Sequence, residues 1–485
     1  MCKRVDVPRS VTPRVRGLIL LTVLVVAAVG LTLALTGGGK RKLVPAGGNS
    51  HGTYDPLAYS RTNDAALERA AAAGEGHIVF AKSPGGVLAT AKRTAHFRPL
   101  VEAAARQGHL DPDMLEAIVF LESAGRPEVI AGSDPQNASG LTQILAETGR
   151  DLLGMHIDLA ASRRITKRIA RARSQKALRH FEAQRRRIDD RFDPRKALAA
   201  TVRYLAIARR HFGRDDLAVT SYHMGIGNLT NVLSDYGGKK GKVSYARLYF
   251  DSSPLHHARA WSLLAQFGDD SSNYYWKLLA AKRIMQLYRR DPAGLRRLAT
   301  LQASRASAEE VLHPPGSTAI YATPEDLKAA QARHELLRLP NEPGRYGFAI
   351  DPLLGQFARR PRQPPALYRA LRPEALGLLV YLSAGVRAIA PKSGPLLVTS
   401  AVRDVLYQHL VAAANIEATH GYSLHTTGFA FDVRRRYASH AEAEAFQFML
   451  DRLQALNLIS WVREPQAIHV TVSSGARVLE PLIGR

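Results

Sequence analysis

Residues 115–123 read Leu115-Glu116-Ala117-Ile118-Val119-Phe120-Leu121-Glu122-Ser123. Apolar residues recur here at three- and four-residue spacing, which predicts a helix with a buried face. Gly125 and Pro127 follow and are expected to end the helix. Glu122 then lies in the last turn of an apolar helix, where partial desolvation raises the pKa of a carboxyl group and suits it to general acid catalysis. From position alone, a solvated surface glutamate is the more common alternative.

The helical spacing continues on both sides of this stretch, from about Phe97 to Leu301. From about residue 346 the pattern changes, because short β-branched runs (LLVTSAV, FAFDV, IHVTV) alternate with helical stretches. Such a mixture indicates an α+β domain. We therefore expect an α+β multidomain protein, with an all-helical domain over residues 95–301 and an α+β domain over residues 346–485.

Two further segments have less regular patterns. Residues 40–94 begin rich in glycine and proline, which predicts a linker, and continue as a segment without a clear assignment. Residues 302–345 are polar and contain several prolines, which predicts a connector.

The composition narrows the classes of protein to consider. The chain has 485 residues, 46% of them hydrophobic, which is typical of globular domains and excludes wholesale disorder, a collagen-like repeat and a multi-span transporter. The only cysteine is Cys2, so neither a disulfide framework nor a cysteine-rich zinc site can form within one chain. The net charge of +25 is compatible with nucleic acid, an anionic membrane or an anionic wall polymer as partner.

An uncharged apolar run occupies residues 17–39. Its length matches the roughly 20 residues that span a bilayer and exceeds the core of about 7–15 residues in a signal peptide. We expect residues 1–16 in the cytoplasm, a transmembrane anchor at 17–39, and the rest of the chain outside the cytoplasm, in the periplasm or cell wall. A cleaved signal peptide is the alternative, and it would export the same residues. A nucleic-acid partner is therefore not expected.

Glu122-Ser123 is followed by a second motif, Ala138-Ser139-Gly140-Leu141-Thr142-Gln143-Ile144, and by a third, Ser221-Tyr222-His223-Met224-Gly225-Ile226-Gly227-Asn228, with Arg191-Phe192-Asp193-Pro194 between them. Over about residues 97–290 they resemble the soluble lytic transglycosylase family, which has a lysozyme-like fold. The resemblance implies that Glu122 is the catalytic acid, with Ser123 beside it. It further implies that Gln143 contacts the glycan and Tyr222 borders the cleft. His223 departs from the family pattern, which has asparagine there, and it either tunes the acid or bonds a helix end.

The family cleaves the bond between N-acetylmuramic acid and N-acetylglucosamine in peptidoglycan. One carboxyl group first protonates the leaving oxygen and then deprotonates the muramoyl 6-hydroxyl, which closes a 1,6-anhydro ring. The chemistry therefore needs no second carboxylate at a fixed distance, unlike ordinary glycoside hydrolysis. No cofactor is expected for this domain.

A basic insertion separates the second and third motifs. Residues 163–191 contain twelve Lys and Arg residues against three acidic residues. The insertion is interpreted either as a basic helix that contacts anionic lipid or wall polymer, or as an ordinary solvated helix face.

The C-terminal domain contains the run Ser423-Leu424-His425-Thr426-Thr427-Gly428-Phe429-Ala430-Phe431-Asp432-Val433. Its Ser-x-His-x-x-Gly-x-Ala-x-Asp pattern resembles the zinc-dependent D-Ala-D-Ala carboxypeptidase and dipeptidase family, over about residues 346–475. The resemblance implies that His425, Asp432 and the later His469 bind zinc. Two imidazoles and one carboxylate leave a coordination position for water, as a catalytic zinc requires. If the run IHVTV forms a strand, His469 and Thr471 share one face of it, with Ile468 and Val470 on the other.

The same resemblance extends to the surroundings of the predicted zinc site. Arg403 and Gln408 match a Ser-x-x-Arg…Gln segment, and Arg403 would bind a substrate carboxylate or stabilise an oxyanion. Glu464 is the candidate general base, although it precedes His469 by five residues where the family has three.

The two motif sets predict a membrane-anchored peptidoglycan enzyme with a glycan-cleaving domain and a zinc D,D- or L,D-peptidase domain. Its partners are glycan strands, stem peptides and the membrane. Two alternatives stay open. The C-terminal domain only binds stem peptides, with or without metal, or both sites are inactive and the protein is a wall scaffold.

Overall fold

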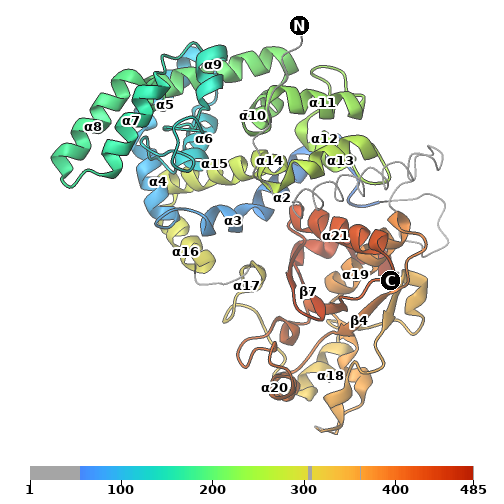
Figure 1. The fold of residues 1–485 in the computed structure, drawn as a ribbon. Helices are drawn as coiled ribbons and strands as arrows, with labels where there is room; N and C mark the ends of the chain where they lie inside the picture. The colour runs from blue at the N-terminus through green and yellow to red at the C-terminus, as the bar shows by residue number, and fades with distance from the viewer. Residues whose placement is uncertain (1–54, 304–307, 361, 484–485) are drawn as a thin grey trace, which may run out of the picture.

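The computed structural model describes residues 55–303, 308–360 and 362–483. The predicted cytoplasmic segment 1–16, the predicted anchor 17–39 and the first part of the predicted linker lie outside these residues. Within the part of the chain that the structure describes, no helix has both the length and the apolar character needed to cross a bilayer. Figure 1 divides the described chain into an upper, helical region and a lower region that contains the sheet.

The helical region ends at residue 303, and within residues 55–303 its strands are reduced to isolated β-bridges. This confirms the helical pattern predicted from Phe97 to Leu301. Its α-helices are, in order, α2 (Asp64–Gly74), α3 (Gly76–Ala81), α4 (Val87–His96), α5 (Arg98–Gly108), α6 (Pro112–Ser123), α7 (Leu159–Ala170), α8 (Gln175–Ile188), α9 (Pro194–Phe212), α10 (Asp215–Met224), α11 (Ile226–Tyr236), α12 (Tyr245–Asp251), α13 (Ala258–Gln266), α14 (Gly268–Ser272), α15 (Tyr274–Arg290) and α16 (Pro292–Ala303).

Three of these helices fall in the segment that had no clear assignment from sequence. Helices α2 and α3 pack against α15, and α4 packs against α6, α15 and α16. Their contacts make residues 64–96 part of the helical domain. Much of the surface that covers them comes from α15 and α16, about 200 residues later in the sequence.

Helices α6 and α15 form the centre of this region and run antiparallel. The hydrophobic residues Ile118 and Val119 of α6 are fully buried. The helix starts after Asp111, whose side chain accepts a hydrogen bond from the backbone of Asp113. It ends before Gly125, as predicted. A Cβ at Gly125 would lie 2.6 Å from the backbone of Arg93 in α4, so only glycine allows this close approach.

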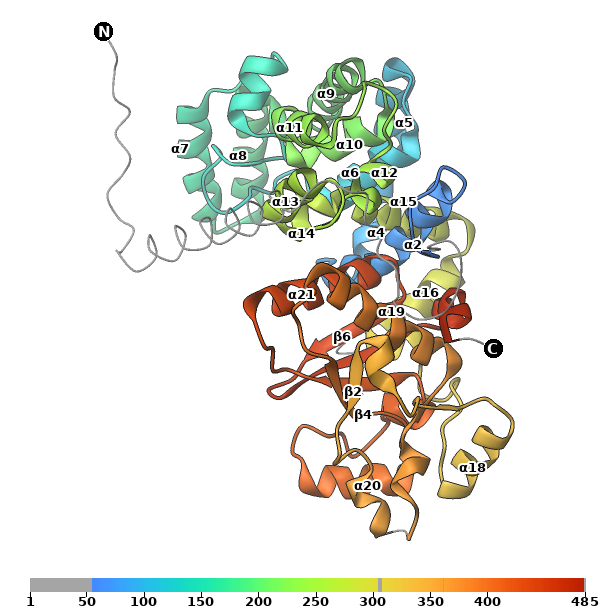
Figure 2. The same cartoon turned by 90° about the vertical axis from the view of Figure 1, so that its right-hand side faces the viewer.

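The C-terminal domain is built on a five-stranded sheet, in the order β2 (Phe348–Ile350), β4 (Leu396–Ser400), β5 (Ala430–Arg434), β7 (Ala467–Val472) and β6 (Ile459–Arg463). Strands β2 and β4 are parallel, and the other pairs are antiparallel. The runs LLVTSAV, FAFDV and IHVTV form β4, β5 and β7, which confirms the α+β prediction. Helices α19 (Pro373–Ile389) and α21 (His440–Ala455) pack together over the sheet, on the side toward the helical region. Helix α20 (Val405–Ala414) lies at the end of the domain that is far from the helical region (Figure 2).

The predicted connector folds with the C-terminal domain. It contains α17 (Glu309–Leu312), α18 (Pro324–Ala332) and β1 (Leu337–Arg338), which pairs with β3 (Ala370–Leu371). Two of its large apolar side chains, Leu327 and Leu336, are buried in a small second core that they share with residues of the C-terminal domain such as Leu367 and Tyr407. Apolar residues this sparse show no clear period in the sequence, so their burial depends on the partners that tertiary folding supplies.

The two regions touch through α21. Arg452 of α21 is half-buried and donates a hydrogen bond to the carbonyl of Ser252 at 2.6 Å. Its guanidinium also lies over the ring of Tyr249, 5.2 Å from the centroid. Phe448 meets Trp261 edge to face at 5.6 Å. Apolar and cation–π contacts therefore join the C-terminal domain to α12 and α13 of the helical region.

Candidate functional site

Glu122 lies at the end of α6, opposite the first residue of α15. The Tyr274 hydroxyl donates a hydrogen bond to the Glu122 carboxylate at 2.7 Å. At the other end of the same antiparallel pair, Arg289 of α15 forms an ion pair with Asp113 of α6 at 2.8 Å. The packing of the two helices thus aligns Tyr274 with Glu122.

The surroundings of Glu122 raise its pKa. Burial of the carboxyl group raises the pKa to about 7, while the hydrogen bond from Tyr274 acts in the opposite direction. Burial, with a contribution from the charge of Glu122, also raises the pKa of Tyr222. Glu122 is therefore a carboxyl group among tyrosines that holds its proton close to neutral pH, as a general acid must.

Tyr222, predicted to border the cleft, belongs to this group. Its hydroxyl donates to the carbonyl of Thr142 at 2.7 Å and lies 3.2 Å from the hydroxyl of Thr201. Its ring packs edge to face on Tyr204 at 5.2 Å. These contacts join α9 and α10 to the loop of the second motif, so motifs distant in sequence meet beside Glu122.

Ser123 and Gln143 stabilise the backbone around the site. Ser123 is buried, and its hydroxyl lies 3.3 Å from the carbonyl of Val119, one turn earlier. The Gln143 amide donates to the carbonyls of Val129 and Gly140 at 3.0 and 2.8 Å. Their contacts with a glycan stay predictions.

The sequence reasoning missed Tyr274 and the role of its neighbour His223. The His223 ring stacks on Tyr274 with centroids 5.0 Å apart, and its Nδ1 lies 3.1 Å from the hydroxyl of Ser271. Burial lowers the pKa of His223, which favours the neutral ring. The aromatic run that opens the helix at Tyr274 was a signal in the sequence, but only the packing of α15 on α6 connects it with Glu122.

The basic insertion forms two helices, α7 and α8, rather than one. Ser174 caps α8 by accepting a hydrogen bond from the backbone of Ala177, which explains the break. Arg185 and Arg191 are buried, so they do not belong to a surface for an anionic partner. Arg191 pairs with Asp189 at 2.8 Å and donates to three carbonyls of the loop that carries the second motif.

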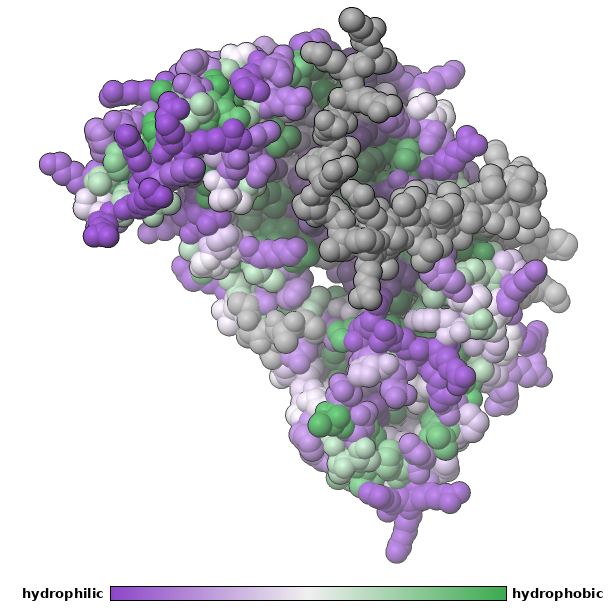
Figure 3. Space-filling model, viewed as in Figure 1, coloured by the Kyte–Doolittle hydropathy of each residue, from purple (hydrophilic) through white to green (hydrophobic). Residues whose placement is uncertain are grey.

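The remaining basic side chains of the insertion point outward. They cover the hairpin of α7 and α8, which lies at the end of the helical region farthest from the sheet (Figures 1 and 2). Many hydrophilic side chains follow this edge in Figure 3. The exposed cations are Arg164, Lys167, Arg168, Arg171, Arg173, Lys176, Arg179, Arg186 and Arg187. Arg186 pairs with Glu128 at 2.8 Å.

A second group of chemically active side chains is brought together by the register of the C-terminal sheet. Asp432 of β5 lies directly opposite His469 of β7. His425 lies in the short turn Leu424–Thr427 that leads into β5. The three candidate metal ligands therefore meet, with their ligand atoms within 4.8 Å of one another. His469 and Thr471 share one strand face, as predicted, since Thr471 Oγ1 lies 3.3 Å from His469 Nε2.

The donor atoms of this group fit a tetrahedral metal. Asp432 Oδ1 lies 3.3 Å from His425 Nε2 and 2.7 Å from His469 Nδ1. Ligand atoms roughly 2 Å from a tetrahedral zinc lie about 3.3 Å apart, so small adjustments would admit the ion. His425 Nδ1 lies 2.8 Å from the carbonyl of Ala401. A carbonyl can only accept, so Nδ1 carries the proton and Nε2 is left as a ligand.

Mutual contact sets the charges of the three groups. Burial alone would raise the pKa of Asp432, but the two imidazoles hold it well below its usual range. Burial and the nearby Arg403 guanidinium lower the pKa of His425 to about 4. Burial opposes protonation of His469, but the carboxylate of Asp432 raises its pKa. At neutral pH, the site offers an ionised carboxylate and a neutral His425, which are the protonation states a metal requires.

Arg403 and Gln408 line the same cavity, as predicted. Arg403 donates to the Gln408 side-chain oxygen at 2.8 Å and to the Ser400 hydroxyl at 2.7 Å. Its guanidinium also lies 3.4 Å from Asp432 Oδ2. Gln408 in turn donates to the carbonyl of Thr419. Arg403 is thus held beside the candidate metal ligands, with its orientation set by Ser400, Gln408 and Asp432.

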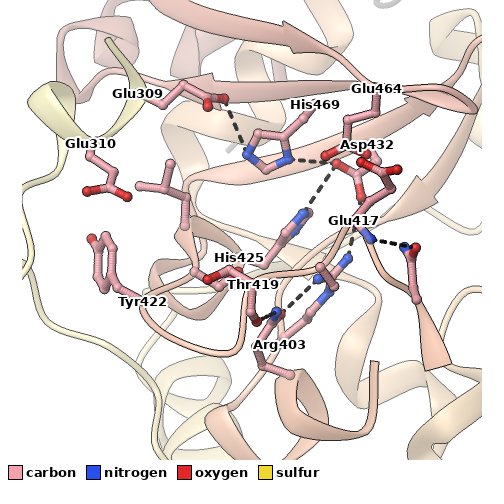
Figure 4. Close-up of a pocket in the computed structure, with 15 residues that line it drawn as sticks. Glu309, Glu310, Arg403, Glu417, Thr419, Tyr422, His425, Asp432, Glu464 and His469 are labelled. Atoms are coloured by element: carbon pink, nitrogen blue, oxygen red, sulfur yellow. Dashed lines mark hydrogen bonds and ion pairs between the residues drawn. The ribbon is translucent and has the colours of Figure 1, made fainter. Parts of the chain in front are cut away.

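Glu464, the candidate base, is also part of this cavity. It follows β6 and opens the turn into β7, where its backbone amide bonds the carbonyl of Ala467 at 2.9 Å. The turn returns the chain so that Glu464 lies beside Asp432 despite the five-residue separation from His469 (Figure 4). Burial and the charge of Asp432 raise its pKa.

The cavity measures about 200 Å³, and several residues that line it were not identified from sequence. Glu309 comes from the predicted connector, and Tyr422 precedes the His425 motif. The Tyr422 hydroxyl donates to the carbonyl of His313 at 2.7 Å, which links the motif to the same connector.

Asp251, His256 and His257 form another cluster, which sequence spacing gave no reason to expect. The Asp251 carboxylate lies 3.1 Å from His256 Nδ1 and 3.8 Å from His257 Nε2. The Tyr236 hydroxyl donates to Asp251 at 2.5 Å, and His256 Nδ1 also lies 2.9 Å from the Asp251 carbonyl. These hydrogen bonds tie α11, α12 and the start of α13 together, which is a structural role.

Comparison with known proteins concerns the helical region. No curated protein matches the chain. Residues 169–244 match the family model described as Transglycosylase SLT domain, a range that includes α8 to α11 and Tyr222 but neither Glu122 nor the C-terminal domain. This similarity supports the lytic transglycosylase family for the helical region, and with it peptidoglycan as the polymer on which this region acts.

Proposed function

We propose that this chain is a membrane-anchored, exported enzyme that remodels peptidoglycan, and that Glu122 is the acid of its glycan-cleaving domain. The observation that carries the proposal is the desolvated carboxyl group of Glu122, which has a pKa of about 7 and a hydrogen bond from Tyr274. The domain match at residues 169–244 supports the reaction class independently.

In the proposed reaction, protonated Glu122 donates its proton to the oxygen that links C1 of N-acetylmuramic acid to N-acetylglucosamine. The bond from C1 to that oxygen breaks, and the N-acetylglucosamine residue leaves as an alcohol. Glu122, now a carboxylate, accepts the proton of the muramoyl 6-hydroxyl while O6 forms a bond to C1. The product is a 1,6-anhydro ring, and Glu122 is again protonated. Tyr274 stabilises the carboxylate between the two proton transfers through the hydrogen bond that its hydroxyl donates.

The test is digestion of purified sacculi with the wild-type chain and with Glu122→Gln. We expect anhydro-muropeptides from the wild type and none above background from the variant. A wild type without these products, or an equal yield from the variant, contradicts the proposal. Products with a free reducing muramic acid would indicate hydrolysis instead.

For the C-terminal domain we propose a zinc-dependent D,D- or L,D-peptidase. His425 Nε2, Asp432 and His469 Nδ1 would hold the ion, which supplies a Lewis acid and an acidified water. Arg403 would bind a carboxylate of the stem peptide, because it lies beside the ligands in a fixed orientation. Glu464 would accept a proton, since its raised pKa suits general base catalysis near neutral pH.

This second activity is tested by zinc content and by turnover of stem peptides, with His425→Ala as the inactive control. Stoichiometric zinc and peptide cleavage in the wild type, both lost in the variant, are expected. Zinc without turnover would favour the alternative of a peptide-binding domain, and absence of both would exclude the metal site.

The position of the enzyme in the envelope is a further part of the proposal. Residues 17–39 would anchor it in the cytoplasmic membrane, and the exposed cations of α7 and α8 would bind anionic lipid or wall polymer. Wild-type retention on sacculi, which contain no bilayer for the anchor, should fall as salt rises. Retention on sacculi that does not change with salt would contradict a role for this charge.

A further inference from the structure

The connector carries a buried carboxylate into the candidate zinc site. Glu309 opens the short helix α17 and is 7% exposed. Its Oε1 lies 3.4 Å from Nε2 of His469, on the side of the ring opposite Asp432 (Figure 4). Because no sequence motif includes Glu309, its role follows only from this contact.

The two nitrogens of His469 face different partners. Nδ1 points to Asp432 Oδ1 at 2.7 Å, where the candidate ligands converge. Nε2 lies within reach of Glu309 Oε1 and, at 3.3 Å, of the Thr471 hydroxyl. The imidazole therefore spans the space between the candidate metal position and the connector.

The direction of the hydrogen bonds follows from the donors available. The Thr471 hydroxyl donates to Glu309 Oε1 at 3.2 Å, so its oxygen can accept a hydrogen bond from His469 Nε2. Directly or through Thr471, the Glu309 carboxylate is the final acceptor for a proton on Nε2. The proton on Nδ1, which Asp432 accepts in the absence of metal, is the one that a metal ion would displace. His425 has the complementary arrangement, since its Nδ1 donates to the Ala401 carbonyl and leaves Nε2 free.

We propose that Glu309 is a positioning residue, which holds the His469 ring in the tautomer that presents the Nδ1 lone pair to zinc. The inference rests on the proposed zinc site and adds a residue from outside the C-terminal motif region. Partners of this kind fix ligand orientation, and their loss typically costs about 10–100-fold in metal affinity. The inference also gives the connector a function, because the orientation of the ligand His469 would depend on Glu309 of α17.

The test is the zinc dissociation constant of the full chain, measured by competition with a chelator. Glu309→Ala should raise the constant about 10–100-fold. Glu309→Gln should retain most of the affinity, because its amide oxygen still accepts a hydrogen bond. The matched control is Glu310→Ala, which removes the same charge one residue along α17, where the side chain points toward Tyr422 in Figure 4. This control should bind zinc like the wild type.

A second measurement keeps the result interpretable if affinity changes through misfolding. Nitrogen-15 NMR of the His469 ring reports which nitrogen carries the proton, and thermal unfolding reports the fold. Nε2 should carry a proton in wild type and in Glu309→Gln, whereas in Glu309→Ala the proton should shift to Nδ1, where Asp432 still accepts it. Wild-type zinc affinity and tautomer in Glu309→Ala would overturn the role of Glu309 alone. A wild-type chain that binds no zinc would overturn the proposed metal site and this inference with it.

Discussion

The two candidate centres of this chain control proton affinity in opposite ways. Glu122 is a carboxyl group among tyrosines, and burial raises its pKa to about 7. Asp432 is buried as well, but its imidazole neighbours hold its pKa well below the usual range. Burial therefore does not by itself decide the charge of a carboxyl group, because the partners within the site determine whether its pKa is raised or lowered. The first arrangement suits proton donation and the second suits metal binding.

The largest expected effect is a complete separation of the two activities. Glu122→Gln should reduce glycan cleavage by about 10³-fold or more, a loss consistent with removal of an essential acid, and leave zinc content and peptide turnover unchanged. His425→Ala should do the reverse. Both variants are measured on the same sacculi and the same stem peptides. Loss of both activities in either variant would contradict two independent centres.

The second effect is the pH dependence of glycan cleavage. Glu122 must be protonated to act first as an acid, and its pKa is about 7. The rate kcat/KM should therefore fall as pH rises through about 7, approaching a tenfold loss for each further pH unit. A profile measured with soluble glycan strands checks this. A fall in kcat/KM that begins near pH 4.5, the ordinary pKa of glutamate, would show that the carboxyl group is solvated.

The third effect concerns stability. The folded pKa of Glu122 is raised from 4.5 to about 7, so the native state binds more protons than the unfolded state between these values. The free energy of unfolding should decrease as pH rises through this window. Glu122→Gln carries no charge, so above pH 7 it should be more stable than wild type by at most about 3 kcal/mol. Below pH 4 the difference should vanish. Denaturant unfolding at pH 4 and pH 8 measures it, and equal stability at pH 8 would contradict the buried charge.

The smallest effect is expected from Tyr274→Phe. The hydroxyl of Tyr274 lowers the pKa of Glu122 against the effect of burial. Its removal should shift the basic limb of the glycan-cleavage profile to higher pH and reduce the rate by about tenfold, the contribution typical of one hydrogen bond to a charged group. Tyr275→Phe is the matched control on the next residue of α15, and it should leave the limb in place. An unshifted limb in Tyr274→Phe would show that the hydroxyl does not contact the carboxylate.

Part of each site could be predicted from sequence, because its residues lie in local motifs. Glu122 ends an apolar helix, and His425 and Asp432 are held seven residues apart by a turn and a strand. Tyr274 could not be found this way, since it reaches Glu122 only through the antiparallel packing of α15 on α6. Glu309 lies in a polar segment without a hydrophobic period, where no local signal indicates burial.

By itself, the sequence determined the order of the domains, the helical and alternating patterns, and the residue types at both centres. These features depend on local spacing, because residues three or four apart share one face of a helix and residues two apart share one face of a strand. Only the tertiary structure decided which residues complete the centres. Tyr274 lies 2.7 Å from Glu122 and Glu309 lies 3.4 Å from His469, across separations of more than 150 residues. Contacts over such separations depend on how helices and strands pack against one another, and local spacing does not encode them.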